Sequence, residues 1–83
     1  MRVQLELYAS LMKHLPPEAE RHRVRAEVPA GTTAVQLLNR YRVPVEQAHL
    51  VLRNGVFLDR AQRAQIALEE GDVIAVWPPV AGG

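Results

Sequence analysis

Hydrophobic and polar residues alternate over residues 2–8, where Val3, Leu5 and Leu7 share one side of the backbone. A period of two is typical of a strand that buries one face. The same alternation recurs near residues 22–28, with valine and alanine on one side and mainly arginine and glutamate on the other. The pattern therefore predicts two half-buried strands in the first third of the chain.

Two further segments have the spacing of helices. Residues 9–15 are predicted to form about one and a half helical turns, which a pair of prolines ends. After a turn at residues 29–31, the hydroxyl of Thr32 or Thr33 can cap a helix. This helix is predicted to run to about Tyr41, because apolar residues recur along it at intervals of three or four. The apolar stripe consists of Val35, Leu37, Leu38 and Tyr41.

The second half of the chain has the pattern of three short strands. Asn54-Gly55 lies between the apolar runs at residues 50–53 and 56–58, and this dipeptide is the strongest short-range signal of a hairpin. Residues 59–70 are predicted to be a polar connection, and the last strand covers residues 73–77. The order of elements predicts an α+β domain of two layers, with one main helix packed across a mixed sheet of four to five strands. The first strand is expected at its centre, parallel to the last.

Strand parity also predicts where the aromatic side chains lie. If Ile74 and Val76 face the core, then Val73, Ala75 and Trp77 face outward, and the same reasoning places Tyr8 outside. Parity does not orient Phe57, which lies in a short apolar run. One interpretation is an exposed patch of Tyr8, Phe57 and Trp77, and large aromatic residues are enriched at binding hot spots. The alternative is that Phe57 and Trp77 merely pack on the sheet edge.

Composition narrows the possible functions. The 83 residues are 48% hydrophobic, which is enough for one small domain with its own core. Ten basic and nine acidic residues give a net charge of +1, which does not indicate a nucleic-acid partner. There is no cysteine, so disulfides and thiol nucleophiles are excluded. No apolar run approaches the ~20 residues of a membrane span, so we expect a cytoplasmic protein without a membrane partner.

Candidate catalytic and metal sites are weak. His14, His22 and His49 lack the spacing of a helical metal pair, so no metal site is expected. Ser10 is the only serine and has no paired histidine, and no glycine-rich phosphate loop is present. We therefore expect no bound cofactor and no catalysis by this chain alone. Three arginines, Arg21, Arg23 and Arg25, are spaced to share one strand face, which is either solvated or meets an acidic partner.

The last residues carry the most distinctive chemistry. Two prolines, Pro78 and Pro79, cannot donate to a sheet ladder and should lift the chain off the body. The chain then closes on Gly82-Gly83, which have no side chains and leave a carboxylate that can enter a narrow site. We predict a domain at residues 1–77 and an extended tail at residues 78–83. A frayed terminus or a cloning scar is the alternative reading of the two glycines.

Four segments together resemble a known family: residues 7–9, 29–38, 52–55 and 70–83. The last is the most specific, because an aromatic residue before Pro-Pro-Val and then a closing Gly-Gly is a restrictive combination. On these segments the chain resembles the MoaD/ThiS family of ubiquitin-like sulfur carriers. The closest likeness is to the small subunit of molybdopterin synthase, and the implied fold is a β-grasp.

The resemblance implies a defined chemistry at Gly83. An E1-like enzyme would adenylate its carboxylate with ATP, and a sulfur donor would convert the acyl-adenylate to a thiocarboxylate. The sulfur would then be delivered in molybdenum cofactor biosynthesis, inside the large subunit of molybdopterin synthase. The chain would be a protein co-substrate that binds no cofactor itself. The residues expected to contact partners are Gly82, Ala81, Val80, Pro79, Pro78, Trp77, Phe57 and Tyr8.

One departure leaves the pathway open. The small-subunit sequences tend to have an Arg-Glu pair after the first strand, whereas this chain reads Leu11-Met12-Lys13-His14 there. Thiamine synthesis or tRNA thiolation are therefore alternative destinations for the sulfur. A non-covalent ubiquitin-like interaction module, or a protein modifier that forms isopeptides, is the rival class.

Overall fold

The structure is a computed structural model that describes residues 1–80. The predictions made for Ala81, Gly82 and Gly83 lie outside the described residues. The helices and strands follow in chain order: β1 (Arg2–Leu7), 3-10 helix η1 (Ala9–His14), β2 (Arg23–Glu27), α1 (Ala34–Arg40), 3-10 helix η2 (Val45–Gln47), β3 (Leu50–Arg53), β4 (Val56–Phe57), α2 (Arg60–Gln65) and β5 (Val73–Trp77).

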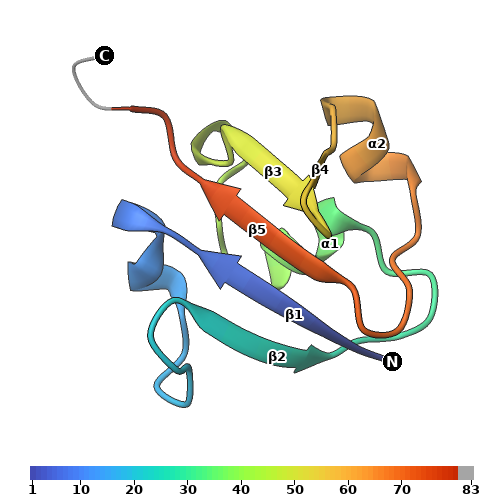
Figure 1. The fold of residues 1–83 in the computed structure, drawn as a ribbon, viewed down its shortest axis with the longest axis horizontal. Helices are drawn as coiled ribbons and strands as arrows, with labels where there is room; N and C mark the ends of the chain where they lie inside the picture. The colour runs from blue at the N-terminus through green and yellow to red at the C-terminus, as the bar shows by residue number, and fades with distance from the viewer. Residues whose placement is uncertain (81–83) are drawn as a thin grey trace.

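The strands form one five-stranded sheet in the order β2-β1-β5-β3-β4 (Figure 1). β1 and β5 pair in parallel at the centre, and every other pairing is antiparallel. The predicted central position of the first strand and its parallel pairing with the last are therefore confirmed. The mixed sheet with a helix across it is also the α+β, β-grasp architecture expected above.

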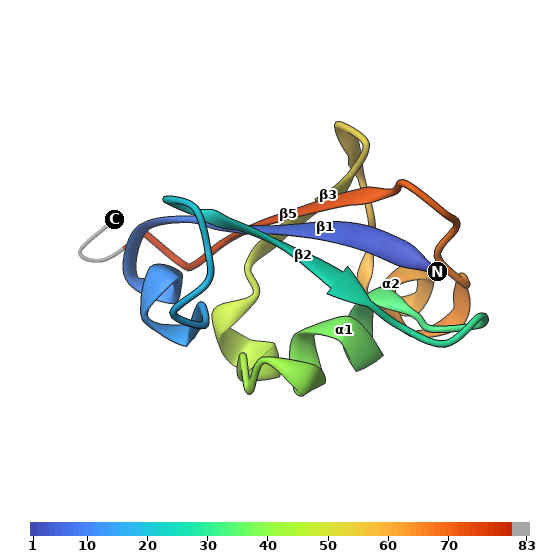
Figure 2. The same cartoon turned by 90° about the horizontal axis from the view of Figure 1, so that it is seen from below.

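Helices cover only one face of this sheet. Figure 2 shows α1, α2 and η1 together on one side, while no helix of residues 1–80 lies over the opposite face of the strands. The covered face holds the core, because Leu5, Leu7, Ile74 and Val76 are each fully buried there. Leu37 of α1 packs into the same cluster. The opposite, open face of the sheet is called the outer face below.

The helix predicted to follow Thr32 or Thr33 begins at Ala34, with Thr33 as its N-cap. The Thr33 hydroxyl accepts from the Gln36 N–H, and the Gln36 side chain accepts from the Thr33 N–H, at 3.2 and 3.0 Å. This reciprocal pair is a capping box. Leu37 and Leu38 of the predicted stripe are buried, and Tyr41, which is half-buried, packs against the core. Val35 is only half-buried and lies outside this cluster, whereas Ala34 is buried.

The prediction of a polar connection over residues 59–70 was wrong, because it contains α2. The Asp59 side chain accepts from the Gln62 N–H, and the Gln62 side chain accepts from the Asp59 N–H, both at 2.8 Å. This is a second capping box, so the Asp-x-x-Gln spacing was a signal of the helix in the sequence. Leu68, which is buried, anchors the segment that follows.

Ala75 alternates with the buried Ile74 and Val76, so it lies on the outer face as parity predicts. Only 8% of its surface is nevertheless exposed. β5 lies between two strands, and Ala75 pairs with Glu6 on one side and Leu52 on the other. Because these two side chains are longer than a methyl group, they cover it without a helix.

A polar network joins the β3–β4 hairpin to the start of β5. The buried Asp72 carboxylate accepts from Arg53 Nε at 2.8 Å, from Asn54 Nδ2 at 2.9 Å and from the Glu69 N–H at 2.8 Å. Burial by itself would raise the pKa of Asp72, but these three donors together hold it below its ordinary value. The network thus fixes the Asn54-Gly55 turn, where Asn54 has a φ of 50° and Gly55 a φ of 82°.

Within residues 1–80, none of the helices is both long enough and apolar enough to cross a membrane. Over the same range, no three histidine or acidic side chains lie together as a potential metal site.

Candidate functional site at the root of the tail

Trp77 ends β5, and Tyr8 directly follows β1. Because the parallel register pairs Leu7 with Val76, the next residue on each strand falls side by side. The two rings are stacked with centroids 4.3 Å apart and planes at 0°. The His22 ring stacks on Tyr8 in turn, at 4.6 Å and 30°. We call His22, Tyr8 and Trp77 the aromatic stack.

The Tyr8 ring is held by a polar chain along β1. Its hydroxyl donates to Glu6 Oε1 at 2.9 Å, and the Gln4 side-chain amide donates to Glu6 Oε2 at 2.7 Å. Burial raises the pKa of Tyr8, and the hydrogen bond to Glu6 and its negative charge raise it further, against the opposing charge of Arg23. The phenol therefore stays protonated at neutral pH and can donate continuously, which fixes the ring against Trp77.

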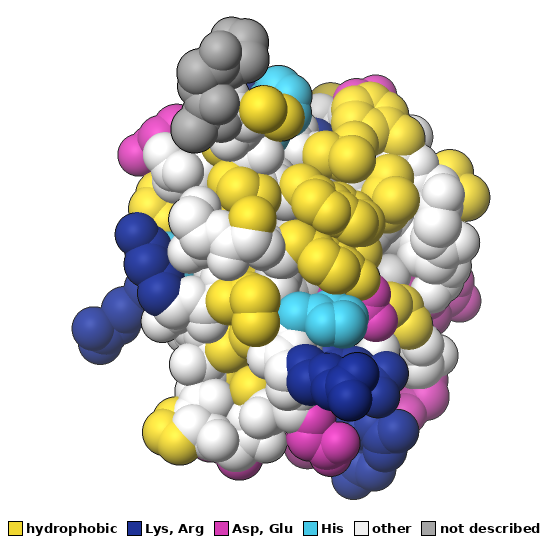
Figure 3. Space-filling view, turned by 60° about the vertical axis from the view of Figure 1, so that its left-hand side comes forward, with side chains coloured by type: hydrophobic (Ala, Val, Ile, Leu, Met, Phe, Trp, Pro, Cys, Tyr) yellow, Lys and Arg dark blue, Asp and Glu magenta, His cyan; other side chains and the backbone are white. Residues whose placement is uncertain are grey.

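Phe57 does not join the stack. Phe57 belongs to β4, which β5 and β3 separate from β1, and it pairs with Leu52 of β3. Its surface is 54% exposed. Leu50, which is half-buried, pairs with Trp77 on the same outer side. Figure 3 shows hydrophobic side chains gathered in one run beside the tail, bordered by a histidine and then by basic side chains. The structure thus brings Tyr8 and Trp77 together, and places Phe57 apart from them.

His22 is the member of the stack that the sequence did not indicate. Alternation near residues 22–28 would put its side chain on the core side with Val24. Instead His22 lies in a turn before β2, next to Arg21 with a φ of 57°. The turn releases His22 from the strand pattern, so parity has no bearing on it.

The tail leaves the domain immediately after the stack. The Trp77 carbonyl accepts from the His49 N–H at 3.0 Å, which anchors the end of β5. Pro78 is half-buried, Pro79 is exposed and Val80 is 80% exposed. Within residues 1–80, no backbone hydrogen bond ties residues 78–80 to the body. The described residues 78–80 therefore follow directly from the end of a central strand.

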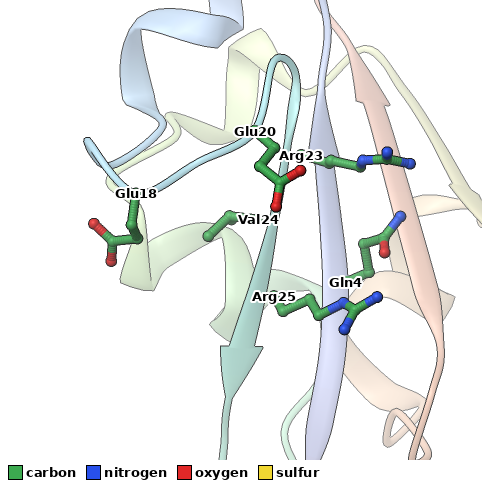
Figure 4. A pocket seen from close by; sticks show the side chains of 6 residues that line it. All are labelled: Gln4, Glu18, Glu20, Arg23, Val24 and Arg25. Atoms are coloured by element: carbon green, nitrogen blue, oxygen red, sulfur yellow. The ribbon is translucent and has the colours of Figure 1, made fainter.

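A shallow hollow lies farther along the outer face, beside β2. It is lined by Gln4, Glu18, Glu20, Arg23, Val24 and Arg25. In Figure 4 the Arg23 and Arg25 side chains extend across β1, whereas Glu18 points away from the sheet. Charges of both signs meet here. The predicted arginine face is partly wrong, because Arg21 lies in the turn and only Arg23 and Arg25 belong to β2.

Comparisons with known proteins agree with this geometry. The sequence profile of the ThiS family matches residues 6–83. Among solved structures, SAMP1 from Haloferax volcanii is 24% identical with a TM-score of 0.68, and the match covers 100% of both chains. The HVO 2177 protein of the same organism is 22% identical with a TM-score of 0.77, covering 100% of this chain and 87% of that one.

A third solved structure is a complex of subunits 1 and 2 of the molybdopterin-converting factor from Helicobacter pylori 26695. The matching chain is 22% identical with a TM-score of 0.57, and both chains are covered completely. No protein with a curated description matches the sequence. Identities this low establish a shared fold, whereas the family match spans nearly the whole sequence. The chain belongs to the ThiS family, and its fold is that of a ubiquitin-like sulfur carrier.

Proposed function

We propose that the chain carries sulfur on Gly83 as a thiocarboxylate. The observation that carries the proposal is the anchored root of the tail. β5 is a central strand, its last carbonyl is held by the His49 N–H, and the chain then continues through two prolines without backbone bonds to the body. A rigid base with a slender extension suits delivery of a reactive end into another protein's active site. Membership of the ThiS family supports the same chemistry.

The chemistry balances in two steps. A carboxylate is ionised at neutral pH and is a poor electrophile. A Gly83 oxygen would attack the α-phosphorus of ATP and displace pyrophosphate, giving the acyl-adenylate. Hydrosulfide released by the sulfur donor would then attack the carbonyl carbon and displace AMP, which leaves the thiocarboxylate and one proton. The activating enzyme binds the ATP in this scheme, and this chain supplies only the carboxylate.

Partner proteins would bind the folded domain at the root of the tail. Ordering a free tail costs ~1–2 kcal/mol per residue, so the body must supply affinity. Trp77 and Tyr8 offer a prearranged aromatic surface, and Phe57 offers a second, more exposed one. The tail residues Pro78, Pro79, Val80, Ala81 and Gly82 would line the partner's channel. The proposed partners are an E1-like adenylating enzyme, a sulfur donor and the large subunit of molybdopterin synthase.

The proposed destination of the sulfur is molybdopterin. The two-subunit complex of the H. pylori molybdopterin-converting factor supports it, because one chain there shares this fold. Thiamine synthesis and tRNA thiolation are the alternative destinations within the same class of carrier.

A protein modifier is the second candidate function. The fold is shared with SAMP1 over the full length of both chains, and ubiquitin-like modification would use the same activated glycine. In that case the acyl group would pass to a lysine of another protein instead of to sulfur. A purely non-covalent binding module would use neither reaction.

Gene replacement tests the proposal. In cells that lack the gene, we expect molybdopterin content to fall and to return with the full chain, but not with a chain that lacks Gly83. Growth without added thiamine and tRNA thiolation are measured in the same strains. Loss of one of these functions without loss of molybdopterin would redirect the pathway. If the chain without Gly83 restored whichever function was lost, this would contradict the carrier function.

A further inference from the structure

Arg63 of α2 is a buried charge that the proposed function does not use. Only 7% of its surface is exposed, and within residues 1–80 no carboxylate forms a salt bridge with it. Burial lowers the pKa of Arg63 below its usual value. Removing a guanidinium from water without an ionic partner is costly, so core packing alone does not call for a charge at this position.

Three backbone carbonyls compensate the charge. Arg63 Nε donates to the Leu58 oxygen and Nη1 to the Ala48 oxygen, both at 2.9 Å, while Nη2 makes a longer bond of 3.4 Å to the His49 oxygen. Leu58 follows β4, and Ala48 and His49 precede β3. One planar guanidinium therefore joins the two ends of the β3–β4 hairpin through three separate nitrogens, whereas a lysine ammonium is a compact point charge without this fork.

The same side chain adjoins both proposed binding surfaces. The Ala48–His49 peptide accepts from Arg63 Nη1 through the Ala48 oxygen at 2.9 Å, and it donates through the His49 N–H to the Trp77 carbonyl at 3.0 Å. That bond is the anchor at the root of the tail. On its other side, the Arg63 guanidinium carbon lies 5.8 Å from the centroid of the Phe57 ring, within range of a cation–π contact.

We infer that Arg63 is a positioning residue that fixes, through His49, where the tail leaves the domain, and that also sets the placement of Phe57. Its role in sulfur transfer rests on the proposed function. Its effect on the positions of His49 and Phe57 does not depend on that function, because these positions are properties of the folded chain alone. The two parts of the inference can therefore be tested separately.

Amide hydrogen exchange tests the positioning part. The variants are Arg63→Met, which removes the charge, and Arg63→Lys, which keeps the charge but not the planar fork. Arg60→Met, on an exposed position of the same helix, is the matched control. We expect exchange at the His49 amide to accelerate at least ~10-fold more than exchange at the β1 amides in Arg63→Met. Arg63→Lys should lie between it and the control.

If exchange accelerated equally at all amides, Arg63 would only stabilise the fold as a whole. If exchange at His49 did not accelerate, Arg63 would not position this residue. Either result overturns the inference. Should Arg63→Met fail to fold, the comparison of Arg63→Lys with Arg60→Met decides in the same way. Emission of Trp77, the only tryptophan, gives a second readout at the tail root.

Sulfur loading in the native cell tests the functional part. We expect the thiocarboxylate fraction, measured by intact mass, to fall at least ~5-fold in Arg63→Lys and to stay unchanged in Arg60→Met, since misplacing a reacting group slows a step that depends on position. Normal loading of Arg63→Lys despite fast His49 exchange would overturn this part. If the unaltered chain carries no sulfur, the proposed function fails, and the exchange result still decides the role of Arg63.

Discussion

At the scale of single residues, the register between β1 and β5 determines which aromatic rings lie together at the surface. Tyr8 and Trp77 meet only because β1 and β5 run parallel with Leu7 opposite Val76. The Glu6 carboxylate then holds the Tyr8 hydroxyl at 2.9 Å. A partner would therefore find the Trp77 ring already placed, and little side-chain entropy would be lost on binding.

Replacing Trp77 tests this surface. We expect Trp77→Ala to weaken binding to the activating enzyme by about 2 kcal/mol or more, roughly 30-fold in Kd, as for a central aromatic hot spot. Titration calorimetry measures the affinity, and circular dichroism checks that the variant is folded. Tyr41→Ala, which removes a half-buried aromatic ring from the helical layer, is the control and should bind normally. Unchanged affinity in a folded Trp77→Ala would refute the aromatic surface.

Asp72 makes stability depend on pH. Its pKa is lowered in the folded state, so its contribution is complete well above the unfolded value of ~3.9. That contribution is lost as pH falls through ~3.9 toward the folded value, because the unfolded chain then binds the proton first. We expect Asp72→Asn to lose about 1–3 kcal/mol at neutral pH. Its unfolding free energy should fall less than that of the parent between pH 5 and 3, as urea titrations would show. Parallel pH profiles would contradict this role.

At the scale of elements, the strands were predictable and α2 was not recognised. Alternation fixed the faces of β1 and β2, and Asn54-Gly55 fixed the hairpin. α2 has almost no apolar stripe, since Arg63 is its one buried residue. A hydrophobic pattern cannot reveal a helix whose buried group is a charge, although its capping box was readable from Asp59 and Gln62.

The N-cap of α2 contributes measurably to the free energy of unfolding. We expect Asp59→Ala to destabilise the fold by about 1 kcal/mol, because the Gln62 N–H loses its acceptor. Asp59→Asn keeps an acceptor at that position and should cost much less. Chemical denaturation compares the two variants. A loss in Asp59→Asn as large as that in Asp59→Ala would mean that the cap does not depend on this hydrogen bond.

The free edge of the sheet at β2 is partly closed. The Arg23 carbonyl accepts from the Glu20 N–H at 2.9 Å, and the Glu27 carbonyl accepts from the Arg40 guanidinium. Exposed edge strands invite pairing with other chains, and occupied carbonyls reduce that tendency. These two bonds therefore occupy part of the edge on which the arginines of β2 lie.

At the scale of the whole molecule, the sequence predicted the mixed sheet and the main helix packed across it. It could not place His22 or Arg63, because a turn frees the first from strand parity and backbone carbonyls hold the second. Phe57 was expected near Trp77, yet the strand order β5-β3-β4 separates them. The face on which a side chain lies follows from the hydrophobic alternation of its own strand. Which side chains meet across the sheet depends on the order of the strands.

The central claim is that Gly83 becomes a thiocarboxylate, and intact-mass spectrometry of the protein from its native cell tests it most directly. A chain that lacks Gly83, expressed in the same cells, is the control. We expect a species heavier than the chain by one replacement of oxygen with sulfur, and no such species in the control. Finding only the unmodified chain, or only forms joined to lysines of other proteins, would contradict the claim.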